Sequence, residues 1–146
     1  MVDQNCAYCM EGELVAKFGI KICELETSKV YLFKEQSHPG RCIVAHKKHV
    51  GDMNELTAEE RAAYFEDVAR VARAIMKAFN PDKVNYGAYG DTGHHLHFHL
   101  CPKYKDEYEW GGVFLMNPDK KYLTDEEYAE IASRILDEWL SESDGS

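Results

Sequence analysis

The sequence has no apolar run that approaches the roughly 20 residues of a membrane-spanning helix. It also lacks an excess of basic residues, because 17 Lys and Arg stand against 26 Asp and Glu, for a formal net charge of −9. A nucleic-acid surface needs the opposite balance to neutralise phosphates. The two absences argue against membrane and nucleic-acid partners. A small nucleotide needs only a few local contacts, so the net charge does not argue against a nucleotide ligand.

A basic, apolar leader is missing from the first residues, so we expect no signal peptide and a cytoplasmic location. The five cysteines are an odd number, which argues against a disulfide framework. Repeats, low-complexity segments and linkers are absent too. The 146 residues, 45% of them hydrophobic, suffice for one domain over residues 1–146, with a flexible polar tail at 141–146.

Three histidines alternate with three apolar residues in one short stretch, which reads His95, Leu96, His97, Phe98, His99, Leu100. Alternation with period two predicts a half-buried strand that carries all three imidazoles on one face. At a rise of roughly 3.3 Å per residue, neighbouring imidazoles are about 7 Å apart. Histidine serves as nucleophile, acid, base or metal ligand near neutral pH, so the pattern indicates a site.

The remaining elements predict an α+β fold with an antiparallel sheet. Further strands are expected at Gly19–Leu25, Ser28–Lys34, Arg41–Ala45 and Val84–Tyr89. Capping boxes at Thr57 and Thr124 open two helices, and Asn80-Pro81 ends the first of them. Residues 110–114 are expected to form a loop and a short strand, and Pro102 to end the histidine strand or place it at an edge. Short turns between neighbouring strands favour α+β over a doubly wound sheet.

Cys6 and Cys9 have the C-x-x-C spacing of half a tetrahedral zinc site. The other two ligands would come from histidines, one near His46 and His49 and one from the triad, because thiolates and neutral imidazoles suit zinc. Such a site would be structural and would fasten the N-terminus to the sheet. Free thiols and a redox pair are the alternatives. No βαβ pattern follows to support a thioredoxin-like pair.

The triad itself favours divided roles over a shared metal. Residues i, i+2 and i+4 of one strand span about 13 Å between their end Cα atoms, so their convergence on one ion would be strained. A neutral imidazole can instead attack phosphorus and form a covalent nucleotidyl-histidine. A second histidine and the backbone N–H groups of the polar loop Gly90–Gly93 can stabilise the phosphoryl oxygens.

These residues resemble the histidine triad (HIT) family, and in particular its zinc-containing bacterial members. The resemblance runs from Cys6 to about Pro102. It includes residues 95–101, the stretch Ile43–His49, which resembles the family's "PKKH" segment, and Asn85 followed by the loop Gly90, Asp91, Thr92, Gly93. It implies a five-stranded antiparallel sheet with two main helices and a homodimer.

The resemblance also implies roles for the histidines. Family members are nucleotide hydrolases or nucleotidyl transferases that act at an α-phosphate. His97 matches the nucleophile that becomes nucleotidylated, His99 matches the histidine that contacts the phosphate and helps the leaving group, and His95 supports the site. In zinc-containing members the ligands would map to Cys6, Cys9, His49 and His95, where His95 has both roles.

Three positions depart from the family pattern. His46 stands in place of the "PKKH" proline and competes with His49 as ligand, although position favours His49. Glu35 is the substitute for the acid that binds ribose hydroxyls, and Asp91 stands where an amide is common, which is unfavourable beside a phosphate. A segment 104–110 with Lys103 and Lys105 forms either a wall over the site or a solvated loop.

The leading hypothesis is a hydrolase or transferase that cleaves a nucleoside phosphoramidate or a dinucleoside polyphosphate through His97. The altered positions Glu35 and Asp91 motivate the rival, a nucleotide-binding or interaction protein with little turnover. A hexose-1-phosphate nucleotidylyltransferase half-domain fits poorly, because such enzymes use a shortened His-Pro-His motif and Leu96 and Phe98 separate the histidines here.

Overall fold

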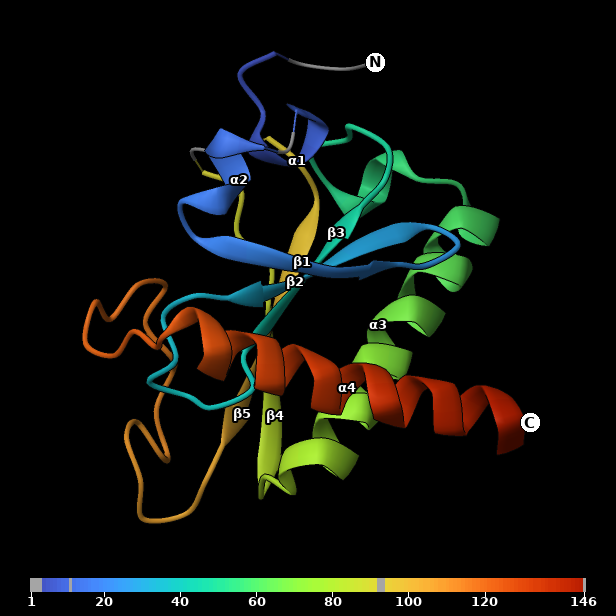
Figure 1. The fold of residues 1–146 in the computed structure, drawn as a ribbon. Coiled ribbons are helices and arrows are strands. Elements are labelled where there is room, and N and C mark those ends of the chain that lie inside the picture. Colours follow the sequence, from blue (N-terminus) through green and yellow to red (C-terminus); the bar gives the residue numbers. More distant parts are fainter. Residues whose placement is uncertain (1–3, 11, 92–93, 146) are drawn as a thin grey trace.

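Five strands form one antiparallel sheet in the computed structural model, which describes residues 4–10, 12–91 and 94–145, with side chains as far as Trp139 (Figure 1). The strands are β1 (Gly19–Glu24), β2 (Ser28–Phe33), β3 (Cys42–His46), β4 (Lys83–Gly87) and β5 (His97–Lys103). Their order is β1-β2-β3-β5-β4, and every neighbouring pair is antiparallel. The predicted α+β class and five-stranded sheet are confirmed. The predicted homodimer stays a prediction.

The helices are α1 (Ala7–Met10), α2 (Glu13–Ala16), the 3-10 helix η1 (Met53–Glu55), α3 (Ala58–Phe79) and α4 (Asp125–Gly145). Both predicted capping boxes are present. The Thr57 side chain accepts from the Glu60 N–H and the Glu60 carboxylate accepts from the Thr57 N–H, and Thr124 forms the same pair with Glu127. None of the described helices is both long and apolar enough to cross a membrane.

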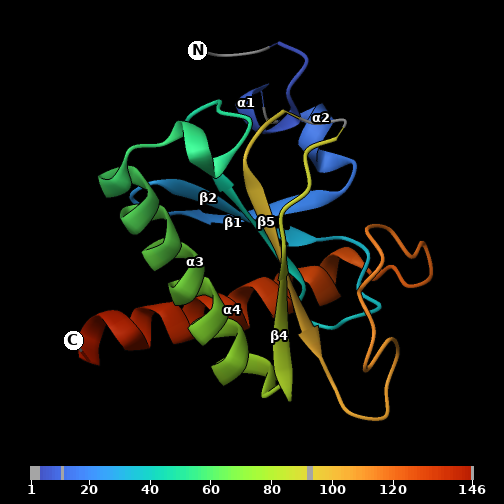
Figure 2. The same cartoon turned by 180° about the vertical axis from the view of Figure 1, so that it is seen from behind.

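The sheet has two differently covered faces. Val30, Leu32 and Val44 belong to the larger core cluster, to which α3 and α4 also contribute. Tyr31, Phe33, Ile43 and Ala45 point to the opposite face and form a second cluster with Tyr8 and Val15 of the N-terminal segment. Figure 2 shows α1 and α2 at one end of the sheet and the long segment between β5 and α4 at its side. Between them, Phe33 and Ile43 help to line a cavity, so this part of the second face is open.

The structure differs from the sequence-based expectation in several places. β5 begins at His97, so His95 precedes the strand. Residues 110–114 form a loop without a strand, because the Lys103 ammonium takes the carbonyls of Glu109 and Gly112 in place of a strand partner. α4 continues through residues 141–145, where a flexible tail was expected, while Ser146 lies outside the described residues.

Pro102 lies inside β5, which continues to Lys103 between β3 and β4, so the prediction that it ends the strand or places it at an edge is wrong. The neighbouring Lys103 carbonyl accepts from the Asp82 N–H on the β4 side, so the Pro102 nitrogen faces the β3 side. Pairing with β3 has already ended there, at the Cys42–Leu100 pair. The missing N–H of proline therefore costs no ladder hydrogen bond.

Asp67 on α3 ties the helix to the β1–β2 turn, since its carboxylate accepts from the Thr27 N–H, the Thr27 hydroxyl and the Ser28 hydroxyl. Asp67→Ala is expected to lower the free energy of unfolding by about 2–4 kcal/mol, because it leaves buried donors unpaired. Urea unfolding measures this effect. Glu66→Ala, at the adjacent exposed position, should change stability little. An equal loss in both variants would contradict the role of Asp67.

Candidate active site

A cavity of about 930 Å³ lies on the open part of the second face. The histidines 95, 97 and 99 line it together with Gly90 and Asp91, as the sequence predicts. Thr92 and Gly93, also predicted to bind phosphate, lie outside the described residues. The apolar side of the cavity comes from Tyr8, Phe18, Phe33, Ile43 and Phe114. The cavity therefore joins a histidine-rich wall to an aromatic wall.

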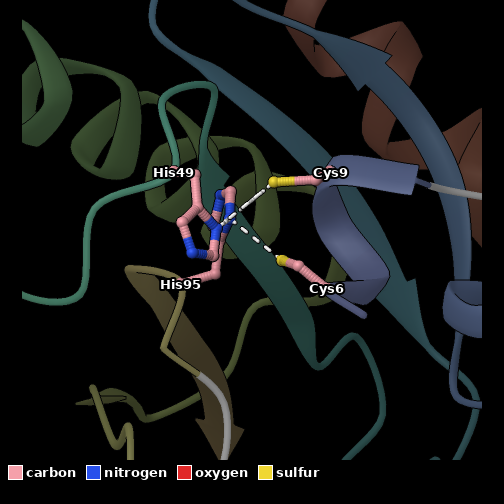
Figure 3. Close-up of side chains that lie close together, drawn as sticks. All are labelled: Cys6, Cys9, His49 and His95. Carbon is pink, nitrogen blue, oxygen red and sulfur yellow. Dashed lines mark hydrogen bonds between the residues drawn. The ribbon is translucent and has the colours of Figure 1, made fainter. Parts of the chain in front are cut away.

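Four potential metal ligands converge at the end of the cavity nearest α1. Cys6 and Cys9 come from the N-terminal segment, His49 from the loop after β3, and His95 from the segment before β5. Figure 3 shows that both sulfur atoms point toward the imidazoles. Their four ligand atoms lie within 4.8 Å of one another. The distance from Nδ1 of His95 is 3.2 Å to Sγ of Cys6 and 3.1 Å to Nδ1 of His49.

This geometry fits zinc. Tetrahedral zinc with bonds of about 2.0 Å to nitrogen and 2.3 Å to sulfur places two nitrogens about 3.3 Å apart, and nitrogen and sulfur about 3.6 Å apart. Sγ of Cys9 lies 3.3 Å from Nδ1 of His49 and 3.6 Å from Nδ1 of His95. These four nitrogen–nitrogen and nitrogen–sulfur separations thus lie within a few tenths of an ångström of the tetrahedral values.

The protonation of the cluster also suits a cation. Nε2 of His95 donates to the His46 carbonyl at 2.5 Å, which leaves a lone pair on Nδ1 toward the cysteines. Burial lowers the pKa of His95 to about 4, so the ring is neutral at neutral pH. Burial raises the pKa of the Cys6 thiol, and a bound cation would oppose that shift by stabilising the thiolate.

A backbone hydrogen bond sets the tautomer of His97. Its Nδ1 lies 2.7 Å from the His95 carbonyl, and because a carbonyl only accepts, Nδ1 carries the hydrogen. Nε2 is then the nitrogen with the lone pair. Burial lowers the pKa of His97, which favours the neutral ring. A neutral imidazole with an unprotonated Nε2 in the cavity wall is able to attack an electrophile.

Two residues that the sequence analysis did not single out surround the triad. Tyr8 lies between Cys6 and Cys9 in the sequence. The centroid of its ring is 5.4 Å from that of His95 and 5.1 Å from that of His97, so it contacts both rings. The Arg41 guanidinium donates to Nδ1 of His99 at 3.1 Å. The only sequence signals for them are an aromatic residue inside C-x-x-C and a charge at the head of an apolar run.

Glu35 does not reach the cavity, so the predicted ribose contact is wrong. Its carboxylate accepts from the Ser37 N–H and hydroxyl and from the N–H groups of Lys120 and Lys121. Burial opposes the charge, but these hydrogen bonds outweigh it and hold the pKa of Glu35 below its usual range. The carboxylate is committed to joining two chain segments.

Two other candidates also lie away from the cavity. Asn85 pairs with Cys101 and borders a separate small depression beside Trp110. The ring of His46 packs on Tyr64 and its Nδ1 accepts from the Lys48 N–H, so the structure places His49, and not His46, beside the cysteines.

The wall over the site comes from a later segment than expected. Residues 114–117 line the cavity, whereas residues 104–110 do not. Glu109 holds this wall in place, because its carboxylate accepts from the Leu115 N–H and pairs with the buried His38 at 2.6 Å. The segment 104–110 thus supports the wall through Glu109 and does not line the cavity itself.

The chain belongs to the histidine triad family, because the model of the HIT domain matches residues 19–106, more than half of the chain. A histidine triad protein of Sinorhizobium meliloti has the same fold, with a TM-score of 0.79, 24% identity, and coverage of 86% of this chain and 93% of that one. A Zn-bound histidine triad family protein of Mycobacterium smegmatis gives a TM-score of 0.65 at 21% identity, over 91% and 94% of the two chains.

Two curated relatives carry names that describe an activity. The adenosine 5'-monophosphoramidase hnt1 of Schizosaccharomyces pombe is 28% identical over 116 residues, which are 73% of this chain and 80% of the relative. The bis(5'-adenosyl)-triphosphatase of Dictyostelium discoideum is 28% identical over 76 residues, about half of each chain. Both names describe hydrolysis at a phosphate of a nucleotide.

Proposed function

We propose that this protein is a nucleotide hydrolase or nucleotidyl transferase that works through a covalent nucleotide on His97. The observation that carries the proposal is the hydrogen bond from Nδ1 of His97 to the His95 carbonyl, which leaves the Nε2 lone pair in the cavity wall. The relatives named as a monophosphoramidase and a triphosphatase support hydrolysis of nucleotides as the general activity.

The two walls of the cavity suit the two halves of a nucleotide. Phe18, Phe33 and Ile43 offer an apolar surface for the base, while His97, His99 and the Gly90–Asp91 segment border the space for phosphate. Asp91 is the only carboxylate among the described lining residues, and it belongs to the phosphate end. The base end therefore binds mainly by stacking and apolar contact.

The reaction follows as two displacements at phosphorus. Nε2 of His97 forms a bond to the α-phosphorus, and the bond from phosphorus to the leaving group breaks with its electron pair on that group. The ring becomes positive, and the His95 carbonyl stabilises the N–H at Nδ1. Water or another acceptor then attacks phosphorus and releases its proton to solvent. The N–P bond breaks with its electron pair on Nε2, and His97 returns to its neutral form.

The cluster at the N-terminus is proposed as a structural zinc site in residues 1–12 and its partners. Cys6, Cys9, His49 and His95 would occupy all four tetrahedral positions, so the ion would have no open position for substrate. Bound zinc would supply a fixed attachment of α1 to the sheet, and with it the placement of Tyr8 against His97. A homodimer completes the proposal, from the family resemblance.

Intact-mass spectrometry tests the covalent step. Brief exposure to adenosine 5'-phosphoramidate or diadenosine triphosphate, followed by a quench that avoids acid, should add one adenylyl group per chain, and peptide mapping should place it on His97. Mononucleotide should appear in solution with further time. Tight nucleotide binding without adduct or mononucleotide, over a broad panel, would overturn the proposal in favour of a binding protein.

A further inference from the structure

Arg41 is an arginine with no exposed surface, directly before β3. Buried arginines usually pair with carboxylates. In the described part of the chain, the hydrogen-bond acceptors of Arg41 are instead the Leu115 and Met116 carbonyls, the Met116 sulfur and one imidazole nitrogen. A charge kept in the interior at this cost calls for a functional explanation.

The guanidinium is held in one position. Its Cζ lies 4.2 Å from the centroid of the Phe33 ring and 4.8 Å from that of Phe114, so it is placed between two aromatic faces. Nη1 donates to the Leu115 carbonyl at 3.0 Å, and Nη2 donates to the Met116 carbonyl at 2.8 Å. The second hydrogen of Nη2 therefore has a fixed direction, toward Nδ1 of His99 at 3.1 Å.

This contact decides which nitrogen of His99 carries the hydrogen. Arginine stays protonated and only donates, so Nδ1 of His99 must accept and the hydrogen of the neutral ring sits on Nε2. His99 is 3% exposed and lines the cavity. Burial, with the charge of Arg41 and the neighbouring His97, lowers the pKa of His99 to about 2, which agrees with a ring that stays neutral.

We propose that Arg41 is a positioning residue that holds His99 as the Nε2–H tautomer, and that this makes the site selective for leaving groups that depart as anions. The inference rests on the proposed function, because it concerns the departure of a leaving group from phosphorus. It goes further by choosing between the two substrate classes that the triad alone leaves open.

The chemical consequence concerns proton delivery. Neutral His99 donates a hydrogen bond from Nε2 to a phosphoryl oxygen, but loss of that proton would create an imidazolate, which is far too basic to form. His99 therefore stabilises charge without acting as a general acid. An amine must be protonated before it leaves phosphorus, whereas a phosphate or diphosphate leaves as an anion. Arg41 thus favours nucleotides joined through a phosphoanhydride over phosphoramidates.

The tautomer is measured directly by ¹⁵N NMR of the histidine side chains in the full-length protein, with His99 assigned by comparison with His99→Gln. The ¹⁵N chemical shifts of His99 are expected to show a protonated Nε2 and an unprotonated Nδ1, and to stay unchanged from pH 8 to pH 5.5. Hydrogen on Nδ1, or an imidazolium within that range, would overturn the inference without any variant of Arg41.

The selectivity is measured with adenosine 5'-monophosphate aryl esters of graded leaving-group pKa, together with the phosphoramidate. For the wild-type protein, kcat/KM should fall steeply as the leaving group becomes more basic. Arg41→Met frees Nδ1 of His99 for protonation, so the ratio of rates between the least and most basic leaving groups should shrink by at least about tenfold. Arg41→Lys keeps the positive charge but loses the paired N–H donors of the guanidinium. Its ratio of rates should lie between those of the wild type and Arg41→Met.

Glu109→Ala is the matched control, because it removes the carboxylate that anchors the same wall through the Leu115 N–H without touching His99. If Arg41 only holds the wall, both variants lower all rates by a common factor, and this result would overturn the inference. A wild-type protein that forms the His97 adduct but shows no leaving-group dependence also refutes it, while the proposed function stands. Absence of any adduct refutes the proposed function, and the NMR result still judges the tautomer.

Discussion

His97→Gln is expected to remove both the covalent adduct and turnover, with a fall in kcat/KM of at least about 10⁴-fold, as nucleophile replacements do in other covalent enzymes. The side chain of glutamine has no basic nitrogen for attack on phosphorus. The fold should persist, because His97 lies in the cavity wall, outside the larger core cluster. Steady-state kinetics with a dinucleoside polyphosphate measures the loss of turnover, and circular dichroism of the same sample measures whether the fold persists.

The matched control is His94→Gln. His94 also lines the cavity, but it is exposed and stands outside the alternating triad. We expect this variant to keep adduct formation and to change kcat/KM by less than about tenfold. Full turnover by His97→Gln, or an equal loss in the two variants, would remove His97 from the role of nucleophile.

Zinc is expected to bind at one ion per chain, and Cys9→Ser to reduce the bound metal and the thermal stability together. Binding free energy of a structural metal contributes to folding free energy, because the four ligands converge only in the folded chain. Loss of the ion frees α1, and Tyr8 with it, so the contact of Tyr8 with His97 is weakened. Activity should fall as well. Native mass spectrometry and a thermal melt with and without chelator measure the effects.

Cys23→Ser separates the metal from the mere loss of a thiol. Cys23 lies on β1 and packs against the larger core, away from the four ligands. The variant should keep one zinc and the chelator sensitivity of the wild type, even if its melting temperature falls. A wild-type protein that binds no zinc, or a Cys9→Ser protein that keeps its zinc, would make Cys6 and Cys9 free thiols.

The sequence predicted the elements whose signal is local. Alternation identified the histidine strand and Val84–Tyr89, and richness in Val, Ile, Tyr and Phe identified the other strands. The Thr57 and Thr124 capping boxes identified the starts of both long helices. All of these signals act between neighbours in the chain. The spacing of the cysteines, with a choice between His46 and His49, came close to the full cluster of Cys6, Cys9, His49 and His95 that could hold a metal ion. The triad pattern identified the centre of the cavity. The same reasoning failed at residues 110–114, because the ammonium of Lys103 on β5 satisfies the carbonyls of Glu109 and Gly112, and no sequence pattern announces this contact.

By itself, the sequence determined the family resemblance, the antiparallel sheet and the histidines at its centre. The alternation of residues, the helix capping boxes and the spacing of histidines and cysteines are all properties of neighbouring residues in the chain. Only the tertiary structure decided what each side chain contacts. It turned Glu35 toward Lys120 and Lys121, chose His49 over His46, and placed Arg41 against His99, 58 positions away. The tautomers of His95 and His99 follow from such long-range partners, since the His46 carbonyl and the Arg41 guanidinium decide which nitrogen of each ring holds its hydrogen.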